Sequence, residues 1–248
     1  MDKLTMKRDR MIDIHMHLIY GVDDGAYDLG MTQMMLFLAK EQGIYKIFAT
    51  PHSYAFDDDK ENVKNRFQEL IEEMGEEYRD AICLGCEVLC EQQNMEKVID
   101  ALNNGKYPTM KGTKYVLVEF LPWANADSIK FCIETLRKAD YKPIVAHVER
   151  YQSLKEEIQL INDLKNMESL IQLNVYSLED SEEVSVREWS RRLVKEKKVD
   201  FLGTDAHRTY QRPPSARYGL KWLYDNTEQE YAEAIAWKNA EELLWTKS

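Results

Sequence analysis

Two histidines near the start of the sequence, His15 and His17, have the type and spacing of metal ligands. They stand in the run MIDIHMHLIYGVDDG, where apolar and polar residues alternate as in a β-strand. Alternation puts both imidazoles on one side of the strand, roughly 6–7 Å apart, so that their ring nitrogens can turn onto one divalent ion. Asp23 and Asp24 follow in an acidic turn that can bring a carboxylate back to the same point. This stretch predicts the opening of a metal site.

All five histidines of the sequence lie in comparable positions. Each falls within a few residues of the end of an apolar, β-forming run that predicts a strand. A single histidine in such a place is more often a hydrogen-bonded core or surface residue, but five of five favour a shared metal site. The histidines are His15, His17, His52, His147 and His207.

Three carboxylates stand at strand ends in the same way. Asp205 follows an apolar run and precedes His207 by two residues, in the sequence Thr-Asp-Ala-His. Glu87 and Glu119 each end a run whose preceding residues are apolar. An acidic side chain in that position is costly unless it is paired or bound to a metal. We therefore expect these three carboxylates to be ligands.

The acidic turn after the first strand adds Asp24 as a fourth carboxylate ligand. Its neighbour Asp23 is equally well explained as a solvated turn residue, and Glu149 as a residue of the surface or of the ligands' surroundings. The predicted ligand set is His15, His17, Asp24, His52, Glu87, Glu119, His147, Asp205 and His207.

The composition of this ligand set indicates which metals it would bind. Imidazole and carboxylate without thiolate suit manganese, iron or zinc, and magnesium less well because of the nitrogen content. Nine ligands exceed what one ion can take, so we expect a cluster of two or three ions. Such clusters activate water near neutral pH and hold the oxygens of a phosphoryl group during an in-line displacement.

Two arginines, Arg150 and Arg212, follow the last two histidines on loops that leave the same strand ends. Guanidinium groups bind phosphoryl oxygens in pairs and stabilise the charge that spreads over them in the transition state. The alternative is that these are loop arginines paired with surface acids. Arg208 and Tyr210 are close enough in sequence to line the entrance to the site.

Seven predicted strands, joined by helical stretches, must position these residues. Such alternation implies parallel strands with right-handed crossovers, in either an open doubly wound sheet or a closed barrel. The ligands follow the first five strands and the seventh. A barrel brings every strand end to one mouth, whereas an open sheet does so only near its switch point, so we expect a barrel. The strands are predicted at 11–17, 46–50, 81–86, 115–118, 143–146, 170–175 and 199–203.

Composition narrows the class of protein. The 248 residues are 44% hydrophobic and show no internal repeat or linker, which favours one α/β domain over 11–248 after a short extension at 1–10. The net charge of −11 disfavours nucleic acid or an anionic membrane as the main partner. No apolar run reaches the ~20 residues of a membrane span, and we see no signal peptide, so a cytoplasmic protein is expected.

The four cysteines do not provide an alternative catalytic group. Cys83 and Cys86 have the C-x-x-C spacing, but no second pair follows to close a structural zinc site, so buried thiols are the better interpretation. None of the four is followed by arginine six positions later, so the Cys-x5-Arg loop of thiol-dependent phosphatases is absent.

Taken together, these motifs resemble the polymerase-and-histidinol-phosphatase (PHP) superfamily over nearly the whole chain. Within it, the VDDG and HVERY runs are similar to those of the manganese-dependent protein-tyrosine phosphatases of bacterial capsule and exopolysaccharide operons. The motifs are D-x-H-x-H (13–17), TPH (50–52), GCE (85–87), VE (118–119), AHVER (146–150) and TDAH (204–207).

The resemblance implies a distorted seven-stranded (β/α) barrel with a three-ion centre. It implies a first ion among His15, His17, Glu87 and Asp205, with Glu87 bridging towards Glu119 and His147, and a third among Asp24, His52 and His207. Arg150 and Arg212 match the family's phosphate-binding arginines. The implied substrate is the phosphorylated, tyrosine-rich tail of a membrane-associated bacterial tyrosine kinase.

We therefore expect hydrolysis of a phosphomonoester by water, without a covalent enzyme intermediate. Three alternatives remain at this point. The same chemistry could serve a small metabolite such as histidinol phosphate, or a short oligonucleotide, since the superfamily includes exonucleases. The third is a metal-binding scaffold without turnover.

Overall fold

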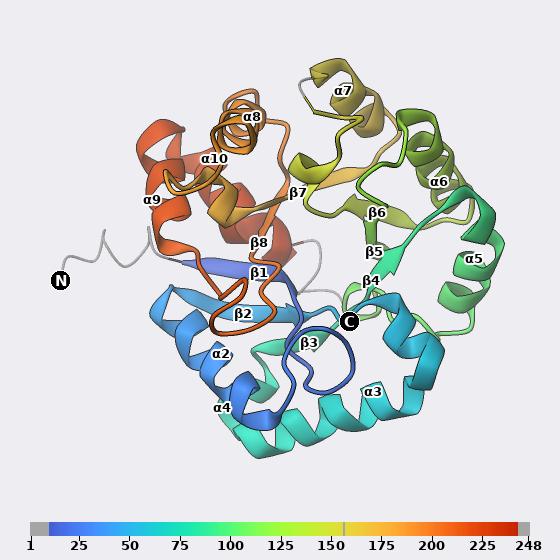
Figure 1. Cartoon of the computed structure of the whole chain (residues 1–248), viewed down its shortest axis with the longest axis vertical. Coiled ribbons are helices and arrows are strands. Elements are labelled where there is room, and N and C mark those ends of the chain that lie inside the picture. Colours follow the sequence, from blue (N-terminus) through green and yellow to red (C-terminus); the bar gives the residue numbers. More distant parts are fainter. Residues whose placement is uncertain (1–9, 156, 243–248) are drawn as a thin grey trace.

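The computed structural model describes residues 10–155 and 157–242 and shows a central set of strands surrounded by helices (Figure 1). The predicted extension at 1–10 lies outside the described residues except for Arg10, as do residues 243–248. The strands are β1 (Met11–Met16), β2 (Ile44–Ala49), β3 (Ile82–Leu84), β4 (Glu87–Leu89), β5 (Tyr115–Glu119), β6 (Lys142–Val145), β7 (Leu170–Asn174) and β8 (Phe201–Gly203).

Helices follow most strands, as the alternating pattern predicts. Their apolar faces pack on the strands, and two short 3₁₀ turns, η3 (Val148–Arg150) and η4 (Val175–Leu178), follow β6 and β7. The helices are α2 (Leu29–Glu41), α3 (Ser53–Met74), α4 (Glu76–Arg79), α5 (Met95–Asn103), α6 (Ala126–Lys138), α7 (Ile158–Asn166), α8 (Val184–Lys195), α9 (Arg217–Asn226) and α10 (Gln229–Glu233). Within the described ranges, no helix combines the length and apolarity needed to cross a membrane.

The strands form two parallel sheets in which neighbours in sequence are neighbours in space. One sheet has the order β1-β2-β3 and the other β4-β5-β6-β7-β8. Isolated parallel bridges between the sheets pair His52 with Glu87 and Met16 with Ala206. The carboxyl ends of all eight strands therefore face the same way, as parallel pairing requires.

The predicted third strand, 81–86, contains only β3, and a further strand, β4, follows it, so the described residues form eight strands where seven were expected. Gly85 and Cys86 separate the two. Gly85 N still donates to Ala49 O at 2.9 Å, but β4, which begins at Glu87, pairs with β5 instead. The chain thus passes from one sheet to the other at this point, which a run of apolar residues could not reveal.

Both sheets contribute to one inner apolar cluster below the carboxyl ends of the strands. Ile12 and Ile14 of β1 meet Phe48 of β2, Leu117 of β5 and Phe201 of β8 there. These side chains are at most 1% exposed. At about 25 cal/mol per Å² of apolar surface, their burial contributes strongly to holding the strand ends in fixed positions.

Candidate metal centre

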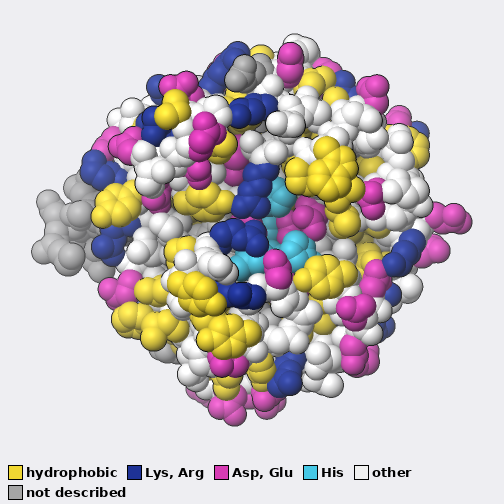
Figure 2. Space-filling view, viewed as in Figure 1, with side chains coloured by type: hydrophobic (Ala, Val, Ile, Leu, Met, Phe, Trp, Pro, Cys, Tyr) yellow, Lys and Arg dark blue, Asp and Glu magenta, His cyan; other side chains and the backbone are white. Residues whose placement is uncertain are grey.

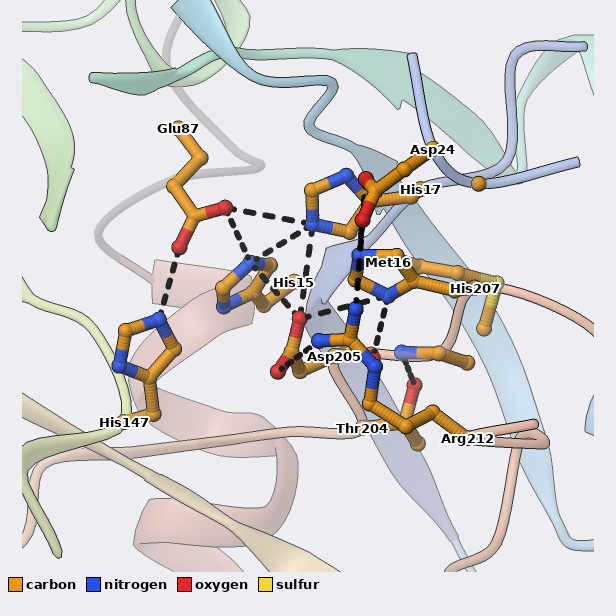
Figure 3. A network of polar contacts seen from close by, with 12 residues as sticks. His15, Met16, His17, Asp24, Glu87, His147, Thr204, Asp205, His207 and Arg212 are labelled. Carbon is orange, nitrogen blue, oxygen red and sulfur yellow. Dashed lines mark hydrogen bonds and ion pairs between the residues drawn. The ribbon is translucent and has the colours of Figure 1, made fainter. Parts of the chain in front are cut away.

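The nine predicted ligands come together in one continuous network at the carboxyl ends of the strands. Figure 3 shows seven of them, all except His52 and Glu119. We divide the network into an inner group and an outer group. The inner group is His15, His17, Glu87 and Asp205, and the outer group is Asp24, His52 and His207. Glu119 and His147 contact the network at its side.

The inner group has the spacing of atoms around one ion. His15 Nε2 lies 3.2 Å from Glu87 Oε2 and 3.5 Å from Asp205 Oδ1, and His17 Nε2 lies 3.2 and 3.4 Å from the same two atoms. The two Nε2 atoms are 3.3 Å apart. A tetrahedral ion with bonds of about 2.1 Å separates its ligand atoms by about 3.4 Å, so the residues fit a divalent cation.

Two further contacts engage Nδ1 of the inner-group histidines and so leave Nε2 as the nitrogen available to a metal ion. His15 Nδ1 lies 3.3 Å from Gln172 Oε1, and His17 Nδ1 lies 2.8 Å from Asp23 Oδ2. A hydrogen bond at Nδ1 fixes the tautomer and orients the ring, as is usual for metal-bound histidine. Sequence reasoning missed both partners. The signal for Gln172 was a polar residue within an otherwise apolar strand.

The outer group lies nearer the surface. Asp24 Oδ1 is 3.4 Å from His52 Nε2 and 3.3 Å from His207 Nε2. His207 Nδ1 contacts the backbone oxygen of Asp205 at 2.9 Å, which again leaves Nε2 as the free atom. The exposed fractions of the side chains are 52% for Asp24, 18% for His52 and 3% for His207.

Glu87 is the residue that connects the whole network. Its Oε1 contacts His147 Nε2 at 2.8 Å, and its Oε2 lies 3.1 Å from His52 Nδ1 as well as beside the inner group. Glu119 Oε1 contacts His52 Nδ1 at 2.9 Å. Within the described chain, Glu87 Oε2 and His207 Nε2 are buried without a hydrogen-bond partner, which is expected of atoms that bind a cation.

The charges of this network favour a cation in place of protons. Burial opposes a charge on His52, but hydrogen bonds to Asp24 and Glu119 raise its pKa to about 10. Burial likewise opposes charge on His15 and His17, yet the neighbouring carboxylates raise the pKa of both. Raised pKa values favour the protonated form of these imidazoles when no metal is bound, and a divalent ion would displace those protons.

Strained backbone coincides with the predicted site. His147, Asp205 and Arg212 have φ values of 32°, 52° and 52°, in the left-handed region that non-glycine residues rarely adopt. Such strain persists only where surrounding structure enforces it, and it clusters at functional sites. At each of these positions the backbone turns sharply at or beyond a strand end.

Two glycines allow the close packing behind the inner histidines. A Cβ atom at Gly203 would lie 2.8 Å from His15 Cβ, and one at Gly25 would lie 2.4 Å from His17 O. Neither distance is possible for a side chain without movement of the backbone or the ligand. The histidines are therefore held by their neighbours as well as by their own strand.

The two predicted arginines converge on the outer oxygen of Asp205. Arg150 Nη1 lies 2.6 Å and Arg212 Nη1 lies 3.2 Å from Asp205 Oδ2, while Arg212 Nη2 lies 3.5 Å from Asp24 Oδ2. Arg208 Nε donates to Gly25 O at 3.2 Å, and Tyr210 is exposed. Figure 2 shows basic side chains beside the visible histidines.

The thiols stand outside this network. Among the described residues all four cysteines are free, and Cys86, Cys90 and Cys132 are buried, whereas Cys83 is partly exposed. Burial raises the pKa of the Cys86 and Cys90 thiols well above its usual range. Thiolate nucleophiles need a lowered pKa, so these are structural cysteines.

The fold and the network define an α/β protein of parallel strands with a candidate multinuclear metal centre at the strand ends. Residues 11–245 match the family described as capsular polysaccharide synthesis, CpsB/CapC. The chain belongs to this family.

Relatives of known name cover almost the full length. The chain is 26% identical over 242 residues to tyrosine-protein phosphatase CpsB of Streptococcus agalactiae, covering 94% of this chain and 98% of that protein. It is 28% identical over 240 residues to tyrosine-protein phosphatase YwqE of Bacillus subtilis, covering 94% and 91%.

A solved structure agrees with these relatives. It comes from work on YwqE of Bacillus subtilis and CpsB of Streptococcus pneumoniae, described as metal-dependent tyrosine phosphatases. It superposes with a TM-score of 0.78 at 26% identity and covers 96% of both chains. The family and the overall fold are therefore shared, and the resemblance to the capsule phosphatases is confirmed.

Proposed function

We propose that this protein is a metal-dependent phosphomonoester hydrolase that removes phosphate from tyrosine residues of a protein in capsular or exopolysaccharide synthesis. One observation carries the proposal: nine histidine and carboxylate side chains converge with two arginines at one set of strand ends. Relatives named tyrosine-protein phosphatase, matched over almost the whole chain, support the choice of phosphotyrosine.

The chain's own residues have separate tasks in this reaction. Bound divalent ions would supply an acidified water and neutralise negative charge on phosphoryl oxygens. Arg150 and Arg212 would donate hydrogen bonds to the same oxygens from the open side of the site, where each is about one-third exposed or more. A phenolate leaving group, with a parent pKa near 10, needs less help from a proton donor than an alkoxide does.

We further propose three ions, with manganese first and iron or zinc as alternatives. The inner group would hold one ion, the outer group would hold another, and Glu87, Glu119 and His147 would hold the ion between them. The distances within the two groups support the first two assignments, and the contact of Glu87 with His147 supports the last.

The architecture we infer is a closed, distorted (β/α)7-type barrel that forms a single domain over 11–248. The bridges between the two sheets and their shared apolar cluster support this closure. The partner we infer is the phosphorylated tail of a membrane-associated bacterial tyrosine kinase, met in the cytoplasm. Membership of the capsule-synthesis family supports it.

The decisive experiment compares substrates and metals on the purified full-length protein. A phosphotyrosine peptide, histidinol phosphate and a short oligonucleotide are compared in kcat/KM after complete chelation and after return of manganese, iron or zinc. We expect activity only with metal, and the highest kcat/KM for the peptide. A higher value for histidinol phosphate or the oligonucleotide would transfer the proposal to that substrate.

The same experiment needs a variant that tests turnover itself. His147→Ala should abolish hydrolysis while circular dichroism shows an unchanged fold. If this variant hydrolyses the peptide at the wild-type rate, the assigned site is wrong. If the wild-type protein binds metal and hydrolyses none of the three substrates, the protein is a metal-binding scaffold.

A further inference from the structure

Strand β7 carries none of the nine predicted ligands and presents a row of polar side chains instead. Gln172 and Asn174 are 0% exposed, and Tyr176 follows them in η4 with the same two-residue spacing. Buried polar side chains are costly unless each has a partner. In this row each side chain contacts the next, so the three form a chain of hydrogen bonds.

One end of this polar row holds the inner part of the metal centre. Gln172 Oε1 accepts from His147 N at 2.8 Å and lies 3.3 Å from His15 Nδ1. Gln172 Nε2 donates to Asn174 Oδ1 at 3.0 Å. The amide of Gln172 therefore cannot rotate without losing a contact to a predicted ligand.

The other end holds Arg150. Asn174 Nδ2 donates to the Tyr176 hydroxyl oxygen at 3.3 Å, and Arg150 Nη2 donates to the same oxygen at 2.5 Å. Arg150 Nη1 meets Asp205 Oδ2 at 2.6 Å. The guanidinium is thus held at two of its three nitrogens, by groups on two different strand ends.

The backbone beneath Arg150 is tied to the same strand. Glu149 lies in η3, the turn that carries Arg150. Its carboxylate accepts hydrogen bonds from Asn174 N at 3.3 Å and from Ser177 Oγ at 3.0 Å. Glu149 is 2% exposed, so it is not the surface residue that was one of its two predicted interpretations. Contacts with β7 and η4 therefore hold both the main chain and the side chain of Arg150 in place.

We propose that Tyr176 is a positioning residue that holds the Arg150 guanidinium ready to bind a phosphoryl oxygen. The inference rests on the proposed function, because it assigns a role within that site. A free arginine side chain loses much conformational freedom when it binds an anion, and a guanidinium fixed beforehand loses less. The hydroxyl of Tyr176 supplies this fixation, with Asn174 and Gln172 holding the hydroxyl in turn.

The test uses Tyr176→Phe, which removes only the hydroxyl, and inorganic phosphate as the probe. Binding of phosphate to the full-length, manganese-loaded protein is measured by calorimetry, and metal content by mass spectrometry. We expect phosphate to bind about five- to tenfold more weakly, with metal content unchanged. Unchanged phosphate affinity, or a loss of metal that accounts for the weaker binding, would overturn the proposal.

A matched control removes the hydroxyl of another partly buried tyrosine, Tyr231. Tyr231 donates to Val199 O at 3.0 Å, before β8 begins and therefore at the opposite end of that strand from the ligands. Tyr231→Phe should leave phosphate affinity at the wild-type value. A loss equal to that of Tyr176→Phe would show a general effect on the fold and contradict the positioning role.

A double-mutant comparison separates positioning from direct binding. In an Arg150→Ala background, Tyr176→Phe should cause no further loss of phosphate affinity, because the hydroxyl acts only through the guanidinium. If Arg150→Ala does not fold, Arg150→Lys replaces it, since lysine keeps the charge but has one nitrogen in place of the fork. An equal loss in both backgrounds would disprove the inference.

Because the probe is phosphate, this test can fail independently of the proposed function. A protein that binds phosphate in the predicted manner but leaves phosphotyrosine uncleaved would retain the positioning role and lose the proposed substrate.

Discussion

The inner and outer groups of the metal centre contain similar ligands in very different surroundings. The inner side chains are at most 2% exposed, and its two histidines are oriented by Gln172 and Asp23 and backed by Gly203 and Gly25. In the outer group the carboxylate of Asp24 is half-exposed and comes from a turn rather than a strand end.

Fewer contacts hold the outer carboxylate, Asp24, in place. Among the described contacts, the backbone of Asp24 is held by Tyr54, whose hydroxyl accepts from Asp24 N at 3.1 Å. The ring of Tyr54 stacks on His52 with centroids 5.3 Å apart. We infer that the inner group is the more preorganised of the two, because its ligands are buried whereas the outer carboxylate is half-exposed, so the outer ion should bind more weakly and exchange faster.

The largest effect should come from the residue that both groups share. Glu87→Gln removes the charge that contacts His15, His17, His52 and His147, so metal content should fall by more than one ion per chain and kcat by on the order of 10³-fold. Asp24→Asn should remove only one ion per chain. Metal is counted by mass spectrometry, and equal losses in the two variants would remove the distinction between inner and outer groups.

A smaller effect is expected at Asp23, because it contacts both groups without belonging to either set of predicted ligands. Its carboxylate contacts His17 Nδ1 at 2.8 Å and accepts from His52 N at 3.1 Å. Asp23→Asn should weaken metal binding about 10- to 100-fold, the usual cost of losing a group that orients a ligand. Asp28→Asn is the control, since Asp28 caps α2 and asparagine caps as well. Wild-type metal affinity in Asp23→Asn would contradict the role.

What the sequence could predict was the meeting of distant residues at one set of strand ends. Parallel pairing guarantees it, so His147 and Asp205 could be placed near His15 from the positions of apolar runs alone. The predicted α/β class and the order of the strands follow from the same periodicity. A histidine or glutamate that ends an apolar run is easy to notice in a sequence, because burying a charge there is costly.

What it could not predict depends on register and on single contacts. The pairing of β1 with β2 shifts between Asp13 and Met16, an irregularity in the strand that carries His15. A bulge of this kind re-aims side chains, but it is set by the partner strand and leaves no local pattern.

The role of Asp13 was hidden for a related reason. Its carboxylate accepts from His15 N at 3.0 Å and from Thr204 N at 2.9 Å, so it joins β1 to the end of β8. Burial raises the pKa of Asp13 to about 6, although these hydrogen bonds lower it. A residue 191 positions away in the chain supplies this contact, which only the folded structure identifies.

The pH dependence of metal binding offers a third way to sharpen the comparison. Hydrogen bonds to carboxylates raise the pKa of His52 to about 10 despite its burial, so below that pH an ion entering the outer group must displace one proton. Burial and the neighbouring His17 lower the pKa of His207, so at neutral pH His207 has no proton for the ion to displace. Outer-group affinity should therefore rise about tenfold per pH unit up to about pH 10.

Calorimetry in buffers of different ionisation enthalpy measures these protons directly. The wild-type protein should release about one proton more than Asp24→Asn does, and the remaining release belongs to the inner group, where the pKa values of both His15 and His17 are raised. Metal binding that releases no protons near pH 7 would show that these histidines are neutral before the metal arrives.

The smallest effect, and the most specific to the outer group, is expected from Tyr54→Phe. The variant keeps the ring on His52 but loses the hydroxyl that accepts from Asp24 N, so the acidic turn has one contact fewer in the bound form. Because Tyr54 is 46% exposed, water replaces part of that bond, and the outer ion should bind only about threefold more weakly. Tyr218→Phe, at an exposed side chain of α9, should change nothing. Competition with a chelator resolves the two classes of ion, and a loss from the inner group in Tyr54→Phe would mean that the two groups do not bind independently.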